Sequence, residues 1–437
     1  MIAVPEYVLD ACKTLVERGF QVYLVGGAVR DSLLGKNPTD WDLSTDARPE
    51  QIENLFAKTR PTGKEFGTVT IVLGENIIEA TTMRLDGPYS DSRRPDRISF
   101  TSKIKDDLSR RDFTINAIAY DPLQEMLIDP FRGRKDLRRK RLVAVGDPKK
   151  RFKEDPLRML RLLRFQAALG FKIDRQTRLA LQSSWIRKVS PERIQNELSG
   201  MLLGIKLYPA LELFYTSGLM QEILPELAAG AGVSPGKRHP YDLLGHSILS
   251  AHFSFPSLHL RWAALLHDIA KTKTSGRAHE KASAQLAGKI LRRLRYSNQL
   301  ISKVETLIAN HMYDLNPYSR DKTWRKFVGK NGVETTFDLI KLRQADLAGM
   351  NVNPLRILRY GTAMEKRLLE IAHRDNALTR ADLRIDGTVL KDALDLSPGP
   401  LVGQILNHLL EQVLADPALN QEKDLLKLAR DFLESKQ

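Results

Sequence analysis

Two aspartates separated by one residue, Asp40 and Asp42, are the side chains whose spacing most directly suggests chemistry. The pattern predicts that both lie on a β-strand. Side chains two apart on a strand point to the same face, so Trp41 turns to the opposite side. Two carboxylates held side by side repel, and a hard divalent cation such as Mg²⁺ relieves that repulsion. The sequence therefore predicts a Mg²⁺ site, although exposed aspartates at a strand end are also ordinary surface residues.

A glycine turn precedes these aspartates. The pattern predicts a strand at residues 22–25, a turn at Gly26 and Gly27, and a helix at residues 28–34. Glycine lets backbone N–H groups approach a phosphate, with the positive end of a helix behind them. Arg30 adds a full positive charge one turn later. Together with the carboxylates, this turn suggests metal-assisted chemistry on a nucleoside triphosphate.

The charge of the chain favours a polyanionic partner. The chain has 437 residues, a formal net charge of +15 and a pI near 9.7. Residues 132–164 alone contain fourteen Lys or Arg against four Asp or Glu. A generally basic surface is the simpler alternative, but this clustering favours nucleic acid, without saying which kind.

The composition, with 42% apolar and 28% charged residues, is that of an ordinary soluble protein. The length suggests about two to four domains. We find no signal peptide and no run of about 18 apolar residues, so we expect no membrane partner. The single cysteine, Cys12, excludes an intrachain disulfide and a cysteine zinc cluster. It fits a reducing cytoplasm and is expected in the core.

The periodicity predicts an α+β fold. Residues 69–73 and 77–82 predict a strand hairpin around a glycine turn, with Glu79 on the second strand. The polar stretch 86–96 predicts a mobile loop. From about residue 150 onward the strand signals vanish and nearly every segment has a helical period. We therefore expect a head of mixed strands and helices, followed by helices alone.

The motif RRDFTINA places Arg110, Arg111 and Asp112 at the start of a predicted helix. Arginine suits a phosphate through its planar fork of donors, and an aspartate accepts hydrogen bonds from ribose hydroxyls. The alternative is a charge cluster in which Asp112 complements the helix dipole.

The motif EDPLRMLRLLRF predicts a helix with Asp155 in its first turn. Arg158 is three residues from Asp155 and therefore adjacent on one face, and Arg161 and Arg164 continue at the same spacing. Asp155 and Arg158 together could hydrogen-bond the Watson–Crick edge of a base. The alternative is an ion pair on a solvated helix, which would contribute about 0.3–0.5 kcal/mol.

Several motifs occur together in an order that resembles a known family. They are GGAVRDSLLG, DWD, EATTMR, DGPYSDSRRPD, RRDFTINAIAY, DPLRMLRLLRF with LGF, and SPERIQNEL, over about residues 20–205. In this order they resemble the class II (bacterial) tRNA nucleotidyltransferase and poly(A) polymerase family. The resemblance implies a polymerase-β-like head, then a helical neck with the nucleotide-selecting helix, a helical body, and a helical tail that binds tRNA. We place these domains at residues 1–140, 141–205, 206–360 and 361–437.

The resemblance also implies an activity, which is the addition of CCA to the 3′ end of a tRNA from CTP and ATP without a nucleic-acid template. Asp40 and Asp42 would hold two Mg²⁺ ions, with Glu79 as a third carboxylate, and the basic neck would grip the tRNA acceptor arm. The residues expected to bind the nucleotide are Gly26, Gly27, Arg30, Arg111, Asp112, Asp155, Arg158, Arg161 and Arg164. Among them, Asp155 and Arg158 would act as a protein template that selects CTP or ATP.

The loop after EATTMR bears on the product. Family members that add only CC are expected to lack a functional loop there, whereas this chain retains DGPYSDSRRP. Enzymes that add only A, and poly(A) polymerases, also keep the loop. CCA addition is therefore favoured, with an A-adding tRNA nucleotidyltransferase or a poly(A) polymerase as the alternative.

A second constellation consists of widely spaced histidines and aspartates. Its members are His246, His267, Asp268, His279, His311 and Asp346. A His-Asp doublet on a helix, with distant His and Asp, resembles the HD domain of metal-dependent phosphohydrolases. We take His246, His267, Asp268 and Asp346 as the candidate site, where imidazole and carboxylate ligands could hold a divalent metal and activate water. A helical scaffold that keeps these residues without a metal is the alternative.

Two hypotheses from other functional classes stay open. One is a phosphohydrolase whose working centre is His267 and Asp268. The other is a non-catalytic RNA-binding protein built on an inactive head. No pattern in the sequence indicates an oligomeric state.

Overall fold

The computed structural model describes residues 2–89, 97–234, 236, 240–272, 279–374 and 379–435. Residues 90–96 of the predicted mobile loop lie outside the described residues. The chain forms two compact units, unit 1 (Met1–Pro225) and unit 2 (Glu226–Gln437). The boundary between them lies just before the stretch rich in Gly and Pro at residues 230–240.

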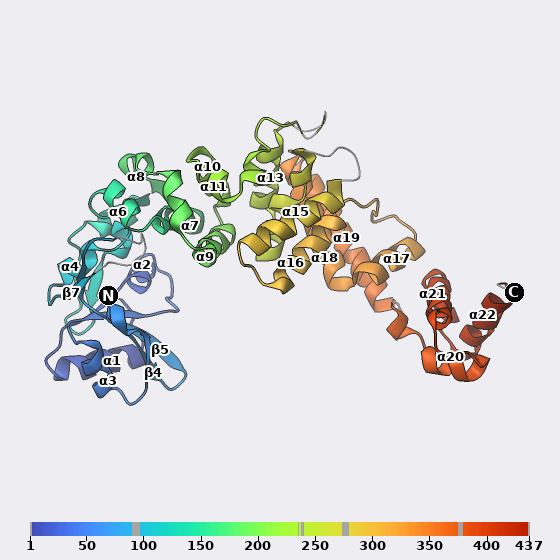
Figure 1. Cartoon of the computed structure of the whole chain (residues 1–437), viewed down its shortest axis with the longest axis horizontal. Helices are drawn as coiled ribbons and strands as arrows, with labels where there is room; N and C mark the ends of the chain where they lie inside the picture. Colours follow the sequence, from blue (N-terminus) through green and yellow to red (C-terminus); the bar gives the residue numbers. More distant parts are fainter. Residues whose placement is uncertain are drawn as a thin grey trace. The chain divides into compact units, whose positions relative to one another are not determined.

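Unit 1 contains a seven-stranded mixed sheet (Figure 1). Its strands, in spatial order, are β3 (Thr59–Gly63), β4 (Thr68–Leu73), β5 (Asn76–Thr82), β2 (Asp42–Thr45), β1 (Val22–Val25), β8 (Ala119–Asp121) and β9 (Met126–Ile128). β2 and β5 pair in parallel, and the other neighbours are antiparallel. The β4–β5 pair confirms the predicted hairpin, with Leu73 opposite Asn76. Helices α1 (Glu6–Glu17) and α3 (Pro49–Leu55) pack against the sheet.

The alternation of side chains along the strands decides what the acidic residues face. In β5, Ile78 and Ala80 are buried, whereas Glu79 is exposed. Asp42 of β2 is opposite Glu79 in the parallel register, so the two side chains lie on the same face of the sheet. Trp41 is 3% exposed and therefore turns into the core, as predicted.

The prediction that Asp40 lies on the second strand was wrong. β2 begins at Asp42, and Asp40 is an exposed residue before the strand. Asn37 and Pro38 favour a turn, so the extended conformation starts later than the DWD pattern indicated.

The other elements of unit 1 are mostly short. They are α2 (Gly27–Leu33), α4 (Ile104–Ser109), α5 (Gly133–Arg138), α6 (Pro148–Glu154), α7 (Leu157–Leu169), α8 (Arg175–Leu179), α9 (Pro191–Leu202), α10 (Leu207–Thr216), α11 (Leu219–Ile223), η1 (Lys64–Phe66), η2 (Thr114–Asn116), η3 (Ser183–Lys188), β6 (Arg84–Asp86), β7 (Ile98–Phe100), β10 (Arg141–Leu142) and β11 (Lys172–Ile173). α7 packs against both α9 and α10. This packing fixes α7, which carries Arg158, one of the two predicted base-selecting residues.

Two helix predictions in unit 1 were wrong. The helix predicted after Arg111 is instead η2 followed by β8, because β-branched residues such as Thr114 and Ile115 disfavour a helix. The helix predicted to contain Asp155 in its first turn is two helices, α6 and α7, and Asp155 lies between them in an extended conformation. Pro156 explains this break, because a proline disfavours the helical conformation of the residue before it.

Unit 2 is helical. Its helices are α13 (Leu243–Phe253), α14 (Leu258–Leu266), α15 (His279–Arg293), α16 (Asn298–Ala309), α17 (Asp321–Asn331), α18 (Val333–Gly349), α19 (Pro354–Arg374), α20 (Gly387–Leu394), α21 (Pro400–Ala415) and α22 (Glu422–Glu434), with the short turns η4 (Ile269–Thr272), η6 (Arg380–Asp382) and η7 (Pro417–Leu419), and α12 (Pro225–Ala228) at the junction with unit 1. α20, α21 and α22 enclose a core of their own around Leu390, Ile405 and Leu425. The domain boundary predicted between residues 360 and 361 falls inside α19.

Together the two units confirm the predicted α+β class, with a mixed head and a helical remainder. Within the part of the chain that the structure describes, every helix is too short or too polar to cross a membrane. The division into four domains stays a prediction.

Cys12 of α1 is fully buried in the core of unit 1, as predicted. Burial, with the nearby charge of Asp121, raises the pKa of its thiol to about 12. Only the thiolate is nucleophilic, so the native chain should resist iodoacetamide at pH 8, whereas the chain unfolded in guanidinium should be labelled fully. Mass spectrometry counts the adducts. Labelling of the native chain at the rate of a free thiol would contradict this burial.

Candidate active site and a buried histidine cluster

A cleft of about 660 Å³ in unit 1 gathers most of the predicted site residues. Ten of the twelve predicted for the head and neck line it, namely Gly26, Gly27, Arg30, Asp42, Arg111, Asp112, Asp155, Arg158, Arg161 and Arg164. The other two, Asp40 and Glu79, are exposed outside its lining. The cleft therefore joins the sheet end at β2 to the start of α7.

Gly26 links β1 to α2 with φ at 74° and ψ at −132°, a conformation that L side chains rarely adopt. A β-carbon at this position would lie 3.2 Å from both Arg111 Nη1 and Asp42 Oδ2. A side chain at Gly26 would therefore displace Arg111 and Asp42 by a few tenths of an ångström, in addition to the strain of the positive φ.

The electrostatics around Asp42 suit a divalent cation. Burial raises the pKa of Asp42 to about 6; Arg111 opposes this rise, whereas Glu79 and Asp40 add to it. A carboxylate that is partly buried beside other carboxylates gains from a bound hard cation. A search of the described residues for three possible metal-ligand atoms within 4.8 Å of one another finds such groups in unit 2, and it finds none at Asp42.

Asp107 positions the arginines at the bottom of the cleft. Its Oδ1 accepts a hydrogen bond from Arg110 Nη2 at 2.7 Å, and its Oδ2 accepts from Arg111 Nη2 at 3.3 Å and from Ser44 Oγ at 3.2 Å. Burial alone would raise the pKa of Asp107, but the two arginines bring it below its usual range. The sequence analysis missed this role, although the i+3 and i+4 spacing to two arginines signals it.

Asp112 connects the head to α7. Its Oδ2 accepts from Arg161 Nε at 2.7 Å, and its Oδ1 accepts from Asn116 Nδ2 at 3.0 Å. Asn116 Oδ1 in turn accepts from Arg30 Nη1 at 2.8 Å. Burial opposes ionisation of Asp112, but Arg161 and then the Asn116 hydrogen bond bring its pKa down to about 2. Asp112 therefore stays ionised and ties α2 to α7 through this chain of contacts.

Arg158 is 9% exposed, and its guanidinium is held on both sides. Nη1 donates to Glu154 Oε2 at 3.0 Å and to the Arg151 carbonyl at 3.2 Å, and Nη2 donates to the Arg110 carbonyl at 2.9 Å. These contacts fix the orientation of the side chain and leave Nε–H and the second Nη2 hydrogen for other partners.

Asp155 is held from a different helix. Its Oδ2 accepts from Arg193 Nη2 of α9 at 2.8 Å, and its Oδ1 accepts from the Leu157 N–H at 3.1 Å. Asp155 and Arg158 thus line the same cleft but do not share one helix face, so that part of the prediction was wrong. The sequence analysis also missed Arg193 as the residue that orients Asp155.

Phe165 lies at the centre of the basic wall of the cleft. The guanidinium carbons of Arg30, Arg161 and Arg164 lie 5.1, 5.6 and 4.9 Å from its ring centroid. Such cation–π contacts hold like-charged arginines near one another. The sequence analysis gave Phe165 no role, although its i+4 spacing from Arg161 places the two on one helix face.

Substitution of Gly26 by alanine tests the close approach at the cleft. Gly35 is the matched control, because its φ of 72° is also positive but nothing lies within 4 Å of its β-carbon position. Both variants should lose about 1–2 kcal/mol of unfolding free energy. Only Gly26→Ala should also lose nucleotide addition, since its methyl displaces Asp42 and Arg111. Equal activity of the two variants in a primer-extension assay would refute the crowding argument.

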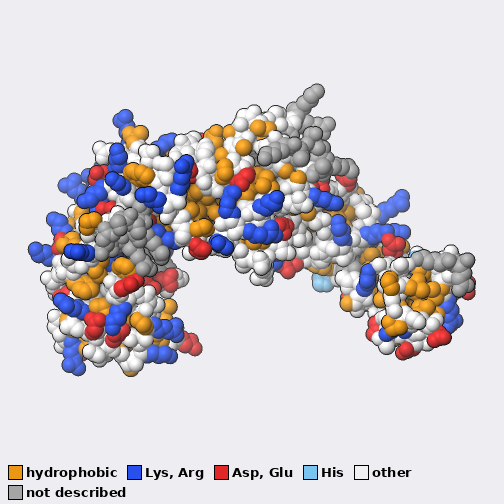
Figure 2. Space-filling view, viewed as in Figure 1, with side chains coloured by type: hydrophobic (Ala, Val, Ile, Leu, Met, Phe, Trp, Pro, Cys, Tyr) orange, Lys and Arg blue, Asp and Glu red, His pale blue; other side chains and the backbone are white. Residues whose placement is uncertain are grey.

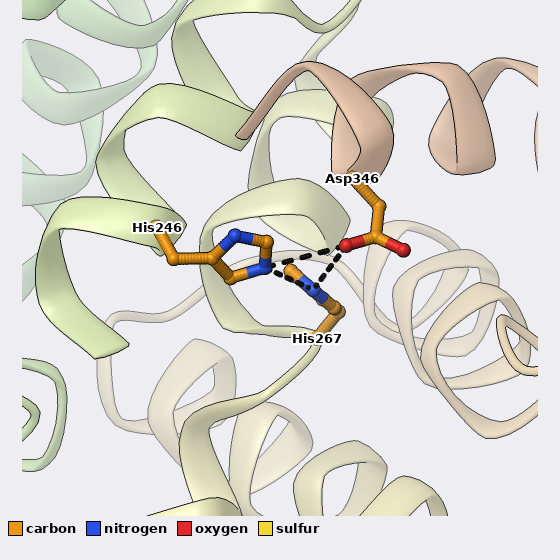
Figure 3. A group of neighbouring side chains, drawn as sticks. All are labelled: His246, His267 and Asp346. Atoms are coloured by element: carbon orange, nitrogen blue, oxygen red, sulfur yellow. Dashed lines mark hydrogen bonds and ion pairs between the residues drawn. The ribbon is translucent and has the colours of Figure 1, made fainter. Parts of the chain in front are cut away.

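In unit 2, the four residues predicted as an HD-type site come together. His246 Nε2 lies 3.1 Å from His267 Nε2 and 3.3 Å from Asp346 Oδ1. Figure 3 shows these three side chains pointing toward one another. Asp268 Oδ2 lies 3.4 Å from His267 Nε2. All four side chains are buried. Burial alone would lower the pKa of His267, but Asp268 and Asp346 raise it to about 9.

Comparison with protein families matches three parts of the chain. Residues 22–143 match the Poly A polymerase head domain, residues 170–230 match an RNA and SrmB binding site of polymerase A, and residues 260–429 match tRNA nucleotidyltransferase domain 2. The first match covers the sheet and the acidic end of the cleft.

Whole-length relatives and structures agree with these matches. The CCA-adding enzyme of Lactococcus lactis subsp. lactis is 32% identical over 96% of this chain and 95% of its own. That of Lactobacillus delbrueckii subsp. bulgaricus is 33% identical over 95% of this chain and 94% of its own. The crystal structure of the Bacillus stearothermophilus CCA-adding enzyme in complex with CTP is 26% identical, with a TM-score of 0.77 over 98% and 97% of the two chains. These findings confirm the resemblance seen in the sequence motifs: the chain belongs to the family of CCA-adding enzymes.

Proposed function

We propose that this chain adds C, C and A to the 3′ end of tRNA, using CTP and ATP and no nucleic-acid template. The observation that carries this proposal is the single cleft that joins the carboxylate of Asp42 to the arginines around Phe165 and to Asp155 and Arg158. Membership of the CCA-adding enzyme family supports the same activity. The single cysteine fits the cytoplasm, which we propose as the compartment.

In this reaction the 3′-hydroxyl of the tRNA loses its proton to solvent, its oxygen bonds to the α-phosphorus, and the bond from the α-phosphorus to pyrophosphate breaks. Asp40 and Asp42, with Glu79 beside them, would hold two Mg²⁺ ions, which when bound stabilise the attacking and leaving oxygens. Arg30 and Arg111 face the space next to the Gly26 backbone, where their charges would bind the triphosphate.

Asp155 and Arg158, at the junction of α6 and α7, would select the nucleotide. Asp155 offers carboxylate oxygens as acceptors. Arg158 offers Nε–H and its second Nη2 hydrogen as donors, because its other N–H groups already bond to Glu154 and to backbone carbonyls. Both side chains are held by neighbours, Asp155 by Arg193 and Arg158 by Glu154, so that neither must be ordered when a nucleotide binds. A fixed pattern of donors and acceptors of this kind can discriminate between base edges.

Thirteen of the fourteen basic residues in the stretch 132–164 fall into two groups, and the fourteenth, Arg141, is half-buried and paired with Asp174. Around the cleft, Arg151, Arg158, Arg161 and Arg164 pair with carboxylates. The exposed group consists of Arg132, Arg134, Lys135, Arg138, Arg139, Lys140, Lys149, Lys150 and Lys153. Figure 2 shows Lys and Arg side chains gathered over the part of unit 1 that carries these residues. We propose that the exposed group grips the tRNA acceptor arm through its phosphates.

The affinity for tRNA should therefore fall as salt rises, because each neutralised phosphate releases counterions. Replacing both Lys149 and Lys150 by alanine should weaken binding at low salt and reduce the slope of log K against log salt by about one to two units. Lys13→Ala, which removes an exposed lysine paired with Asp10 on α1, should change neither. A filter-binding affinity that stays flat between low and moderate salt would refute the grip.

The product is tested with a tRNA that lacks its 3′ end. The full chain is incubated with CTP, ATP or both, and the 3′ ends are sequenced. Complete CCA ends with both nucleotides, and CC with CTP alone, are the expected result. Addition of A alone, or long A tails, would replace this proposal by the A-adding or poly(A) alternative. No addition at all would support a non-catalytic RNA-binding protein.

A second candidate function belongs to unit 2. The convergence of His246, His267, Asp268 and Asp346 in one buried cluster favours a divalent metal site and, through it, hydrolysis of phosphate esters. Hydrolysis of p-nitrophenyl phosphate with Mn²⁺ tests it. The activity should persist in Asp42→Ala and disappear in Asp346→Ala; loss of both activities in Asp42→Ala would assign hydrolysis to the head.

A further inference from the structure

The outer face of α19 carries leucines that neither candidate function uses. Leu355, Leu358 and Leu369 are each at least half exposed. Successive steps of three, four and seven residues through Thr362 place these four side chains on one face of the helix, because an α-helix has about 3.6 residues per turn. This is the spacing of the apolar seam in a coiled coil. We refer to Leu355, Leu358, Thr362 and Leu369 as the α19 seam.

The opposite face of α19 is already packed. Met364, Leu368 and Ile371 are fully buried in a core that includes Trp324 of α17 and Ile340 of α18. The helix extends over Pro354–Arg374 and is therefore about 30 Å long. The α19 seam is a second apolar face, which unit 2 leaves exposed to solvent over much of this length.

The seam continues into a cavity of about 610 Å³ in unit 2. Phe253 at the end of α13 and Phe255 just after it line this cavity together with Leu358, and both phenylalanines are more than half exposed. Glu365 lines both this cavity and the hollow next to Leu369. Single exposed apolar residues are ordinary on a protein surface, but a continuous patch marks an interaction site.

The charged residues beside the seam are sorted along the helix. Arg356 and Arg359 are exposed in the first two turns, Glu365 and Lys366 lie near the middle, and Glu370 lies near the other end. Basic residues near the start and an acidic residue near the end oppose the preference of the helix dipole. This order of charges therefore does not serve the stability of α19 itself.

A second copy of α19 in the reverse direction is complementary to the seam. A two-fold axis can place Leu358 of each copy opposite Leu369 of the other, so that the leucines of both copies meet. In this register Thr362 lies opposite Glu365 of the second copy, and its hydroxyl can donate to that carboxylate. Each Leu369 then reaches the edge of the cavity that Leu358 lines.

The same register brings opposite charges together. The first turns of one helix lie beside the last turns of the other, so Arg359 of each copy lies next to Glu370 of the other. Oε2 of Glu370 accepts from Arg367 of its own helix at 2.9 Å, which leaves Oε1 for the second copy. The pair occurs twice, whereas a parallel arrangement would place like charges together.

We propose that the α19 seam binds a second copy of this chain and forms a two-fold dimer of antiparallel α19 helices. Burial of the leucines, with Phe253 and Phe255 beside them, drives association, and the Arg359–Glu370 pairs set the direction. Nucleic acid suits this face less well, because Glu365 and Glu370 border the leucines.

Sedimentation velocity of the full chain over a range of concentrations tests the dimer. The parent should form a dimer that dissociates on dilution. Leu358→Asp places a charge in the seam of both copies and should raise the dissociation constant at least about tenfold. Leu179→Asp is the matched control, because Leu179 of α8 in unit 1 is also well exposed, and this variant should dimerise like the parent.

Charge exchange tests the antiparallel register. Arg359→Glu alone and Glu370→Arg alone each create two like-charged pairs, so each variant should weaken the dimer at least about tenfold. In an equimolar mixture, a mixed dimer has opposite charges at both ends. The mixture should therefore recover the dimer that each variant lacks alone.

Each contrary outcome removes a stated part of the proposal. A parent that stays monomeric at every concentration would overturn the dimer, and weaker tRNA binding by Leu358→Asp would then assign the face to tRNA. A dimer that Leu358→Asp leaves intact would place the interface elsewhere. A mixture that stays monomeric although Leu358→Asp disrupts the dimer would overturn the antiparallel register.

Folding of every variant is verified by circular dichroism. Glu370→Arg also removes the acceptor of Arg367. If that variant does not fold, a mixture of Leu358→Lys and Leu369→Asp replaces the charge exchange, because its mixed dimer has one lysine opposite one aspartate and one leucine opposite one leucine. This mixture should dimerise more tightly than either variant alone, and equal or weaker association would overturn the register.

Discussion

Replacement of Asp42 by alanine is expected to abolish nucleotide addition. The carboxylate sits at the end of the sheet inside the cleft, beside Arg111 and on the same face as Glu79. Loss of a metal ligand removes several kcal/mol of charge stabilisation from the transition state, which corresponds to a rate reduction of about 10³-fold or more. Single-turnover addition of CMP to a tRNA that lacks its end measures the loss.

The stability of the same variant separates chemistry from folding. Because the folded-state pKa of Asp42 is raised to about 6, its stabilising contribution exists at low pH and is lost as the pH rises through that value. At pH 7.5 without Mg²⁺ the ionised carboxylate therefore lowers the free energy of unfolding. The melting temperature of Asp42→Ala should be no lower than that of the parent. Mg²⁺ should raise the melting temperature of the parent but not of the variant. Asp10→Ala, an exposed residue of α1, serves as the control with full activity. Retained addition by Asp42→Ala would refute the metal assignment.

Local patterns were enough to predict the elements around the Asp42 end of the cleft. The strand at residues 22–25, the glycine turn and the β4–β5 hairpin depend on neighbours within a few residues, and the structure confirms them. Trp41 is buried and Asp42, the next residue, faces the cleft, so the predicted opposition of these two side chains holds, whereas Asp40 lies before the strand. Alternation and turn chemistry carry this information in the sequence itself.

The contacts that hold the site in place were not predictable in the same way. Asp107 was given no role in the prediction, yet it orients Arg110 and Arg111. Arg193 reaches Asp155 from 38 positions further along the chain. The Asp155–Arg193 pair forms only when α9 packs on α7, and a single sequence does not specify the register of that packing. The motifs therefore predicted which residues line the cleft, whereas tertiary packing decides which residues orient them.

The break at Pro156 illustrates the difference. A helical period across residues 154–165 suggested one continuous helix with Asp155 and Arg158 on one face. The proline instead ends α6 and places Asp155 in extended backbone, free of the helix and within reach of Arg193. Both residues line the cleft, each held by its own partners, so the break that made the local prediction wrong is part of how the site is built.

Replacement of Arg158 should remove the choice of base. A well-placed pair of hydrogen bonds to a base edge discriminates by about 1–3 kcal/mol, so kcat/KM for CTP and ATP should fall about 5–150-fold relative to UTP and GTP. Arg158→Ala would also leave Glu154 and the Arg151 and Arg110 carbonyls without their donor, at a cost of about 1–3 kcal/mol in unfolding free energy. Arg158→Lys keeps the charge near Glu154 but lacks the planar fork. It should therefore stay folded and still lose discrimination.

The measurement is kcat/KM for each of the four nucleoside triphosphates on a tRNA that ends before the first C. Arg187→Ala is the matched control, because Arg187 is also paired with a glutamate, Glu222 at 2.6 Å, but its side chain is 71% exposed on another face of unit 1. That variant should keep the preference for CTP and ATP and the stability of the parent. If Arg158→Lys discriminates as well as the parent does, the guanidinium fork does not contact the base, and Arg158 only supports the junction of α6 and α7.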